Sequence, residues 1–355
     1  MNLSMSKSAI ARRSVLGFAL GCGVLHAAPL ARDVLARPAL AVGKPERAVL
    51  LGAATAGKRL VAVGERGVIV YSDDLGASWK QAPSPVSATL TSVRFADAQL
   101  GVAVGHGGTV LTTGDGGLSW TLRLEGRGVA TLVQEAASRR GDAALAEAAK
   151  RLIAEGPDKP FLDVHMTDRD RMELVGAYGL ALGTIDAGAQ WTVWMDRLEN
   201  PKLLHHYAVR RRGDRMVLAG EQGMVFRSGD GGASFTRIHT PYRGSFLTAE
   251  LPGDRDIVVA GLRGNAWLST DDGATWGQLR SPTAATITAS VRSLDGVLFF
   301  GDQAGFLLKR KDDQLVAVNE APLAPITAVV SAGERRFVVA TMQGVAIVED
   351  RQTTQ

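Results

Sequence analysis

An eight-residue pattern recurs five times in this chain and limits what the chain can fold into. In the first copy, Ser72–Trp79, a Ser or Thr is followed by Asp two residues later, Gly four later and an aromatic residue seven later. Most copies are about 41 residues apart, and this period predicts an array of similar units, such as the blades of a β-propeller. The repeated positions are Asp74, Gly76, Trp79, Asp115, Gly117, Trp120, Asp186, Gly188, Trp191, Asp230, Gly232, Phe235, Asp271, Gly273 and Trp276.

The residue types of this pattern are suited to a tight turn. A short Asp side chain accepts hydrogen bonds from nearby backbone N–H groups, and Gly adopts positive φ without steric cost. The closing aromatic residue can cover the turn from one side. A calcium site needs about six to eight oxygen ligands, whereas each turn offers one or two carboxylates. We therefore expect these positions to be structural, and we expect no metal and no cofactor.

A second pattern, in which two Gly residues enclose two others, precedes each copy. The first example is Gly64–Gly67, with the apolar runs 60–63 before it and 68–71 after it. Two apolar runs joined by such a tip predict a β-hairpin. Related tips continue at Gly301–Gly305 and Thr341–Gly344, which makes seven hairpins. We predict an all-β fold, a seven-bladed β-propeller of four-stranded antiparallel blades.

The hairpins set the expected boundaries of the blades. We place the seven blades at 47–83, 89–124, 160–196, 203–239, 244–280, 284–318 and 325–349, the last with three strands. The short apolar piece Ala39–Val42 is expected to supply the missing strand and to close the ring, because an open ring would expose strand edges. The predicted domain boundaries are a linker at 29–37, the propeller at 38–349 and a tail at 350–355.

One interval between copies is longer than the others by about 30 residues. The extra segment, 126–158, is rich in Ala, Glu and Arg; Asp142 can cap a helix, and Gly156-Pro157 can stop it. We predict a short helical insertion between blades two and three. Two roles remain open for it: shielding one mouth of the propeller, or binding a partner.

The hairpin tips and the connections between blades should share one face, with the Asp turns on the other. We predict a binding face at the tips, formed by Glu65, Arg66, His106, Tyr178, Glu221, Gln222, Arg263, Asp302 and Gln303. The basic run Arg210, Arg211 and Arg212 is a candidate docking patch at the first turn of blade four. His205 and His206 are adjacent on an expected strand and would point to opposite faces, so they cannot hold a metal together.

The first residues look like a targeting segment. Lys7, Arg12 and Arg13 precede the apolar run Val15–Leu25, which predicts a signal peptide at 1–28 and export to the periplasm by the Sec or twin-arginine route. A lipid anchor on Cys22 is less favoured, because Ala19 stands where Leu is usual. Without the three basic residues the formal net charge falls from +4 to about +1, so we expect no nucleic-acid partner. We expect a monomer.

The repeated turn resembles the Asp-box, or BNR repeat, of sialidase-like propellers. With the export signal, the insertion and hairpins such as Gly220–Ser228, the chain resembles the photosystem II stability/assembly factor-like family. The stretch Gly156–Asp163 is similar to its non-photosynthetic bacterial branch. This resemblance implies a non-catalytic binding or scaffold protein, an assembly or accessory factor for a membrane protein complex such as an RND-type exporter.

Two other classes of function stay open. A sialidase-like glycoside hydrolase would use a Tyr nucleophile helped by a Glu, and Tyr178 and Glu221 lie on adjacent hairpin tips. The Phe/Tyr-Arg-Ile-Pro motif with which such enzymes begin does not occur in the chain. The other class is a propeller that binds a small ligand at its channel mouth.

Overall fold

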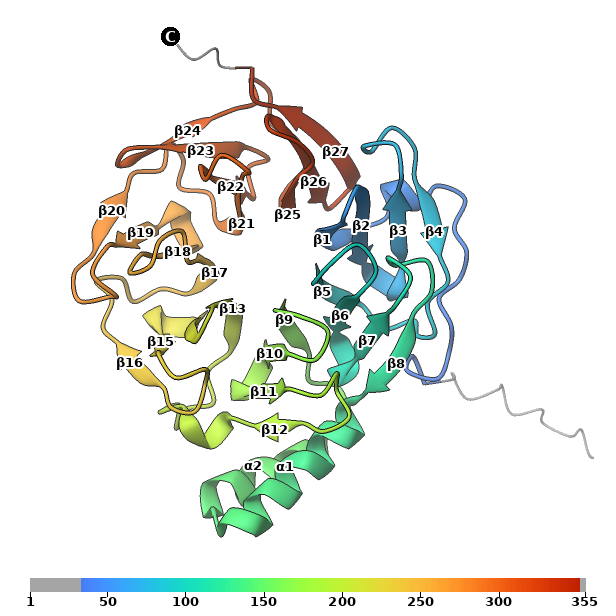
Figure 1. Cartoon of the computed structure of the whole chain (residues 1–355), viewed down its shortest axis with the longest axis vertical. Coiled ribbons are helices and arrows are strands. Elements are labelled where there is room, and N and C mark those ends of the chain that lie inside the picture. Colours follow the sequence, from blue (N-terminus) through green and yellow to red (C-terminus); the bar gives the residue numbers. More distant parts are fainter. Residues whose placement is uncertain (1–32, 352–355) are drawn as a thin grey trace, which may run out of the picture. The chain divides into compact units, whose positions relative to one another are not determined.

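The described part of the computed structural model, residues 33–351, is a ring of β-sheets around a central channel (Figure 1). Among these residues there are six four-stranded sheets and one three-stranded sheet, and each is a simple antiparallel meander. The prediction of a seven-bladed β-propeller is confirmed. The predicted signal peptide and Cys22 lie outside the described residues.

The blades contain the following strands. Blade one has β1(Leu50–Ala56), β2(Arg59–Gly64), β3(Ile69–Ser72) and β4(Lys80–Ala82); blade two has β5(Leu90–Phe95), β6(Gly101–Gly105), β7(Val110–Thr113) and β8(Thr121–Leu124); blade three has β9(Phe161–Met166), β10(Met172–Gly176), β11(Ala181–Thr184) and β12(Thr192–Val193). Blade four has β13(His206–Arg212), β14(Arg215–Gly220), β15(Val225–Ser228) and β16(Thr236–Ile238); blade five has β17(Phe246–Glu250), β18(Ile257–Gly261), β19(Ala266–Ser269) and β20(Gly277–Leu279). Blade six has β21(Ile287–Arg292), β22(Leu298–Asp302), β23(Leu307–Lys311) and β24(Gln314–Ala317), and blade seven has β25(Ile326–Ser331), β26(Arg336–Thr341) and β27(Gly344–Glu349).

The hairpin tips are short 3₁₀ turns that need glycine at their second Gly position. These turns are η2(Glu65–Gly67), η3(His106–Gly108), η4(Ala177–Gly179), η6(Glu221–Gly223) and η7(Leu262–Gly264). In the first, Gly67 has φ +73°, and a Cβ there would lie 2.1 Å from the carbonyl oxygen of Val86 in the connection to blade two. The repeated glycine therefore allows each connection to cross close above a hairpin tip.

The apolar core is divided among the contacts between neighbouring blades. Seven clusters of buried apolar side chains are present in the described chain, and each joins two adjacent blades. One of them joins the last blade to the first, with Val338 of β26 packed among Leu60 and Val70. In addition, the Thr327 hydroxyl donates to the Leu50 carbonyl at 2.6 Å. Blades seven and one are thus in direct contact.

The expected closing strand at Ala39–Val42 is wrong. This segment forms no strand; it lies along the outside of blade one, where the Ala39 N–H donates to the Ser84 carbonyl and the Gln81 amide bonds the backbone of Leu40 and Val42. Prolines at 38 and 45 limit how far a strand could extend here. Leu35, in the predicted linker, is buried against blade two, and Asp350, in the predicted tail, is buried beside Lys309.

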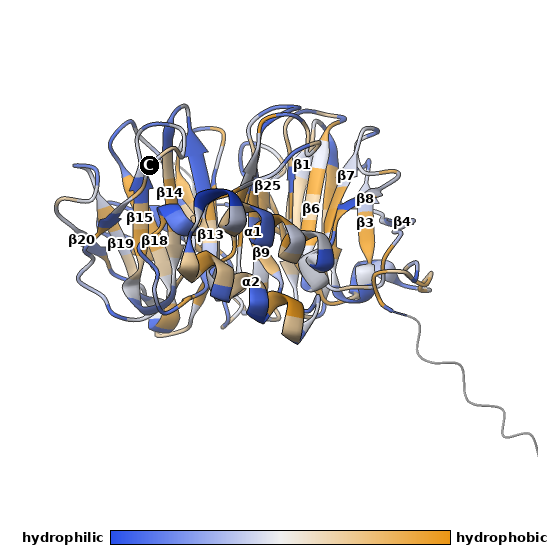
Figure 2. Cartoon of the chain, turned by 90° about the horizontal axis from the view of Figure 1, so that it is seen from below, coloured by the Kyte–Doolittle hydropathy of each residue, from blue (hydrophilic) through white to orange (hydrophobic). Residues whose placement is uncertain are grey.

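The insertion forms two helices, α1(Gly126–Arg140) and α2(Ala143–Glu155), and the Asp142 carboxylate caps α2 through the Leu145 N–H. Figures 1 and 2 show both helices outside the ring, beside β12. Val133 of α1 belongs to the core cluster of blades two and three, and Arg140 donates to the Val193 carbonyl on β12. The insertion therefore covers the edge of blade three, and the suggestion that it shields the channel mouth is wrong.

Candidate functional site

The repeated Asp residues lie in the turns between third and fourth strands. In blade one the Ser72 hydroxyl donates to Asp74 and accepts from the Gly76 N–H, while Asp74 also accepts from the backbone and hydroxyl of Ser78. The hydroxyl donors Ser78 and Thr275 are the main cause that lowers the pKa of Asp74 and Asp271 to about 2. These carboxylates accept hydrogen bonds within their own turns, so their role is to stabilise the turns.

The proposed binding face at the hairpin tips is only partly available. Seven of its nine residues are exposed, namely Glu65, Arg66, His106, Tyr178, Gln222, Arg263 and Gln303. Asp302 is fully buried and accepts hydrogen bonds from the Thr283 hydroxyl and the Phe306 N–H. Asp302 is therefore a structural residue of its turn, and its place in a binding face was a wrong prediction.

The tips of blades three and four meet at His205. Its Nδ1 lies 3.0 Å from Glu221 Oε2, and its ring lies 5.1 Å from the Tyr178 ring. The Lys159 ammonium stands over the other part of the Tyr178 ring, 4.9 Å from its centroid. Burial opposes ionisation of Glu221, but hydrogen bonds from the His205 backbone and imidazole outweigh it and lower the pKa of that carboxyl.

This arrangement does not favour a glycosidase. Glu221 is held by His205 and Tyr207, and in the described chain no hydrogen bond joins it to Tyr178. A Tyr nucleophile would need that carboxylate as its base. Residues 33–351 also hold no cluster of three or more side chains able to bind a metal ion, and no helix among them is long and apolar enough to cross a membrane.

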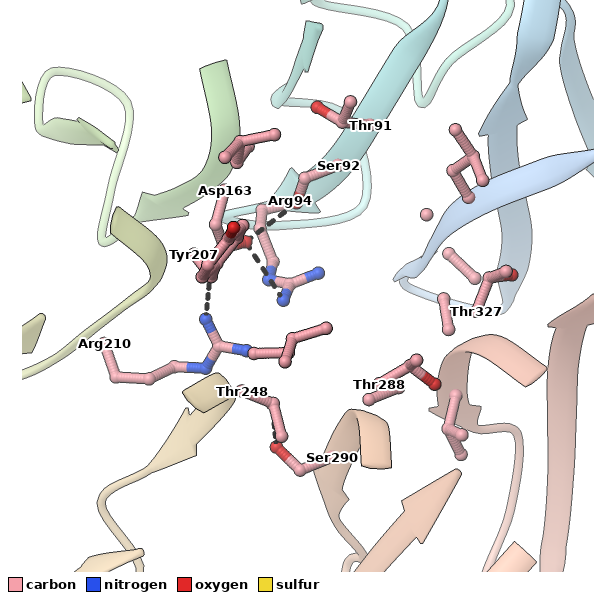
Figure 3. A pocket seen from close by; sticks show the side chains of 18 residues that line it. Thr91, Ser92, Arg94, Asp163, Tyr207, Arg210, Thr248, Thr288, Ser290 and Thr327 are labelled. Carbon is pink, nitrogen blue, oxygen red and sulfur yellow. Dashed lines mark hydrogen bonds and ion pairs between the residues drawn. The ribbon is translucent and has the colours of Figure 1, made fainter. Parts of the chain in front are cut away.

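The first strands of the blades line the central channel, which contains a cavity of about 90 Å³. This volume holds a few water molecules. Figure 3 shows that Arg94 and Arg210 project into the cavity on either side of Asp163. Thr248 and Ser290, on the next blades, share a hydrogen bond at its border.

Asp163 is the centre of the channel network. It accepts hydrogen bonds from Ser92, the Val209 N–H and Arg210. Burial would raise the pKa of Asp163, but the guanidinium groups of Arg210 and Arg94 outweigh it and hold the pKa low. Arg210 also faces Glu250 at 3.7 Å. Its pKa is raised, since the two carboxylates outweigh the cost of burial.

Arg94 is the least satisfied cation of the channel. Its Nη2 lies 3.6 Å from Asp163, and its side chain is 30% exposed. Among residues 33–351 its guanidinium donates a hydrogen bond only to the carbonyl of Val93. Burial lowers the pKa of Arg94, and the attraction of Asp163 offsets this only in part, because Arg210 shares that carboxylate. Arg94 can therefore accept a further anionic partner.

Four polar or charged side chains of the channel occupy one position of the blade repeat, whereas Asp163 lies two residues earlier in its strand. Arg94, His165, Arg210 and Glu250 stand at equivalent places in the first strands of blades two to five, as the strand registers show. Blades six, seven and one carry Val291, Val330 and Ala54 there. Burial and the two arginines lower the pKa of His165 to about 3, so its imidazole is neutral. Sequence reasoning missed this set, although aligning the repeats would have revealed it.

The basic run at 210–212 forms no surface patch, so the docking patch was a wrong prediction. The strand β13 extends to Arg212, and its alternation places Arg211 on the opposite face from Arg210 and Arg212. Arg210 faces the channel, and Arg211 is buried with Glu173 between blades three and four. Only Arg212 is exposed, where it pairs with Asp254. His205 and His206 lie at the start of the same strand, and burial lowers the pKa of His206 to about 4.

A ring of seven antiparallel blades with Ser/Thr-x-Asp-x-Gly turns defines a BNR-type β-propeller. Residues 146–298 match the family model described as photosynthesis system II assembly factor YCF48. Over 115 residues the chain is 30% identical to the photosystem II assembly lipoprotein Ycf48 of Synechococcus sp. (strain CC9902), a match that covers 32% of each. The matched part thus spans about a third of the length of that relative.

Solved structures agree with the fold. The chain is similar to YCF48 bound to D1 peptide, with TM-score 0.63, 15% identity and coverage of 89% of this chain and 100% of that one. It is similar to YCF48 from Cyanidioschyzon merolae, with TM-score 0.63, 13% identity and coverage of 86% of this chain and 97% of that one. It is also similar to the WD40 β-propeller domain of Doa1, with TM-score 0.60, 9% identity and coverage of 90% of this chain and 97% of that one. Residues 146–298 are thus similar to the photosystem II assembly factor family over less than half of the chain, and the solved structures show that the fold is a β-propeller.

Proposed function

We propose that this protein is an exported, non-catalytic assembly or accessory factor that binds a segment of a membrane protein. The observation that carries the proposal is Arg94, a channel cation whose pairing with Asp163 is incomplete. A carboxylate of an extended segment, from a side chain or a chain end, would complete its hydrogen bonds. The solved YCF48 with a bound D1 peptide supports a peptide as the ligand.

The partner in this protein's host is inferred from the family resemblance. We propose an envelope membrane complex, with an RND-type exporter as the specific candidate. Export of the propeller to the periplasm follows from the predicted signal at 1–28. The name of the curated relative, a lipoprotein, is compatible with an extracytoplasmic location.

The test is chemical crosslinking in the host envelope with the tagged full chain, followed by identification of the captured proteins. The decisive variant is Arg94→Gln. The matched control is Arg292→Gln, because Arg292 is an exposed arginine of blade six that donates a hydrogen bond to the Gly296 carbonyl. We expect one membrane protein to be recovered with the wild type and the control, and about tenfold less with Arg94→Gln.

Two outcomes contradict the proposal. One is that no membrane protein is enriched over an untagged control. The other is equal recovery with Arg94→Gln, provided that thermal unfolding shows both variants to be folded. Deleting 126–158 would not be a clean test, since this segment contributes Val129, Val133 and Leu152 to the core.

A further inference from the structure

The seventh blade presents an unpaired strand edge. In the part of the chain that the structure describes, the other six blades each have a fourth strand, whereas blade seven ends with β27 as its third. Figure 1 shows β27 at the outside of its sheet. It has six residues, longer than the fourth strands of the other blades. An exposed edge of this length is a template for pairing with another chain.

The register identifies which backbone groups are open. Thr341 and Gly344 close a two-residue hairpin, so their pair is hydrogen-bonded and the pairs alternate from there. The N–H and C=O groups of Val345, Ile347 and Glu349 therefore point away from β26. No hydrogen bond to these six backbone groups occurs among residues 33–351. An extended backbone offers donors and acceptors with the same alternation, so it can pair with this edge as an added strand.

The segment that precedes β1 does not fill this place. Asp33 pairs with Arg127 at the start of α1, and residues 39–42 lie along blade one. The 3₁₀ turn η1(Pro45–Arg47) crosses close to the start of β27, where a Cβ on Gly344 would lie 2.1 Å from the Glu46 carbonyl oxygen. Residues 33–49 thus pass β27 without pairing with it.

The side chains along the edge indicate which segment fits. Val345, Ile347 and Glu349 alternate with the residues of the opposite face, and Ile347 is 39% exposed although its tip packs near Gly76 of blade one. An added antiparallel strand would meet Glu349 first, Ile347 two residues later and Val345 two residues after that. The positions opposite Ile347 and Val345 suit apolar residues. Cross-strand pairs of opposite charge are favourable, so a Lys or Arg suits the position opposite Glu349.

We propose that β27 binds an extended segment of a partner polypeptide as the fourth strand of blade seven, with a basic residue followed at alternate positions by two apolar residues. This site is separate from the channel and does not depend on the proposed function. A contact with an envelope protein could use either site, and each has its own variants. The backbone pattern determines affinity here, and the alternate side chains determine specificity.

The probe is the peptide acetyl-Lys-Thr-Ile-Thr-Val-Thr-amide, titrated into the isotope-labelled full chain and followed by NMR. We expect saturable shifts centred on Val345, Ile347 and Glu349. N-methylation of the peptide's Ile and Val removes the two N–H groups that would face β27, and it should weaken binding at least about tenfold. N-methylation of the two Thr residues between Lys and Val, whose N–H groups face away, should leave binding unchanged.

A charge exchange tests the orientation. Glu349→Lys should weaken the binding of the Lys peptide and strengthen the binding of a peptide with Glu in place of Lys. The control Glu334→Lys, on an exposed turn, should change the binding of neither peptide. The proposal is overturned if both N-methylated peptides bind alike or if no peptide binds at about 1 mM. It is also overturned if the β27 edge amides are already protected from exchange in the free chain, by a second copy or by the chain's own terminal residues. Concentration dependence of that protection would identify the second copy.

Discussion

Arg211 donates to Glu173 at 2.8 Å, and both side chains are buried between the third and fourth blades. The second carboxylate oxygen of Glu173 has no hydrogen-bond partner among residues 33–351. Burial therefore raises the pKa of Glu173 to about 7, and the nearby guanidinium only partly opposes this. One buried pair thus couples the contact between these two blades to pH.

The first prediction concerns the sign of that coupling. The folded-state pKa of Glu173 lies above its ordinary value near 4.5, so the folded chain retains a proton that the unfolded chain releases. The free energy of unfolding must then fall as pH rises from about 4.5 to about 7. Relative to Glu173→Gln, we expect the wild type to lose roughly 1–3 kcal/mol between about pH 5 and pH 8 in urea unfolding. The exposed control Glu199→Gln should retain the wild-type pH dependence, and equal slopes in all three proteins would contradict the assignment.

The second prediction compares the stability contribution of Asp74, which lies in a turn with the full repeat pattern, with that of Asp312, which lies in a turn that has lost the pattern. Asp74 has its pKa lowered to about 2, so its contribution to stability is present above about pH 4 and is lost as pH falls toward 2. Asp312 occupies the corresponding repeat position in blade six, but there Lys311 and Gln314 close a two-residue hairpin. We expect Asp74→Asn to lower Tm by a few degrees at neutral pH and to matter less near pH 2. Asp312→Asn, which keeps a residue tolerant of positive φ, should leave Tm unchanged.

The third prediction concerns the junction of the last and first blades. Thr327→Val removes the hydroxyl that donates to the Leu50 carbonyl, and we expect a loss of about 1 kcal/mol in the free energy of unfolding. Thr91 makes the same contact to the Phe161 carbonyl between blades two and three, so Thr91→Val should cost a similar amount. Thr236→Val, on the exposed part of β16, is the control. A neutral Thr327→Val beside a costly Thr91→Val would mean that the two end blades are not joined in solution.

The blades were predictable because their signals are local. The Asp turns and glycine tips fix where the chain reverses, and a period of about 41 residues then determines the number of blades. The channel network was not predictable in the same way, since Asp163 and Arg210 come from different blades and meet only when the ring forms. The misassigned arginine run shows the same limit: three adjacent cations resemble a solvated turn unless the end of β13 at Arg212 is known.

The closing contact was missed for a related reason. Counting strands indicated that blade seven needs a fourth, and Ala39–Val42 was the nearest apolar piece. The segment instead satisfies its backbone through the Gln81 side chain, an interaction that leaves no periodic signal in the sequence. Strand counting therefore showed that blade seven has only three strands of its own but assigned the fourth to the wrong segment, and among residues 33–351 the edge of β27 has no partner strand.

The fourth prediction tests whether the helical insertion, besides covering the edge of blade three, contacts a partner. Val133 is fully buried in the cluster that joins α1 to blades two and three, whereas Ile153 on α2 is 53% exposed. Val133→Ala should therefore cost roughly 1–3 kcal/mol in urea unfolding, and Ile153→Asp should change stability by less than about 0.5 kcal/mol. If the insertion only covers the edge of β12, Ile153→Asp will also leave recovery of the membrane partner unchanged. If recovery falls while the folded chain is as stable as the wild type, α2 contacts the partner directly, because the substitution alters only an exposed apolar surface.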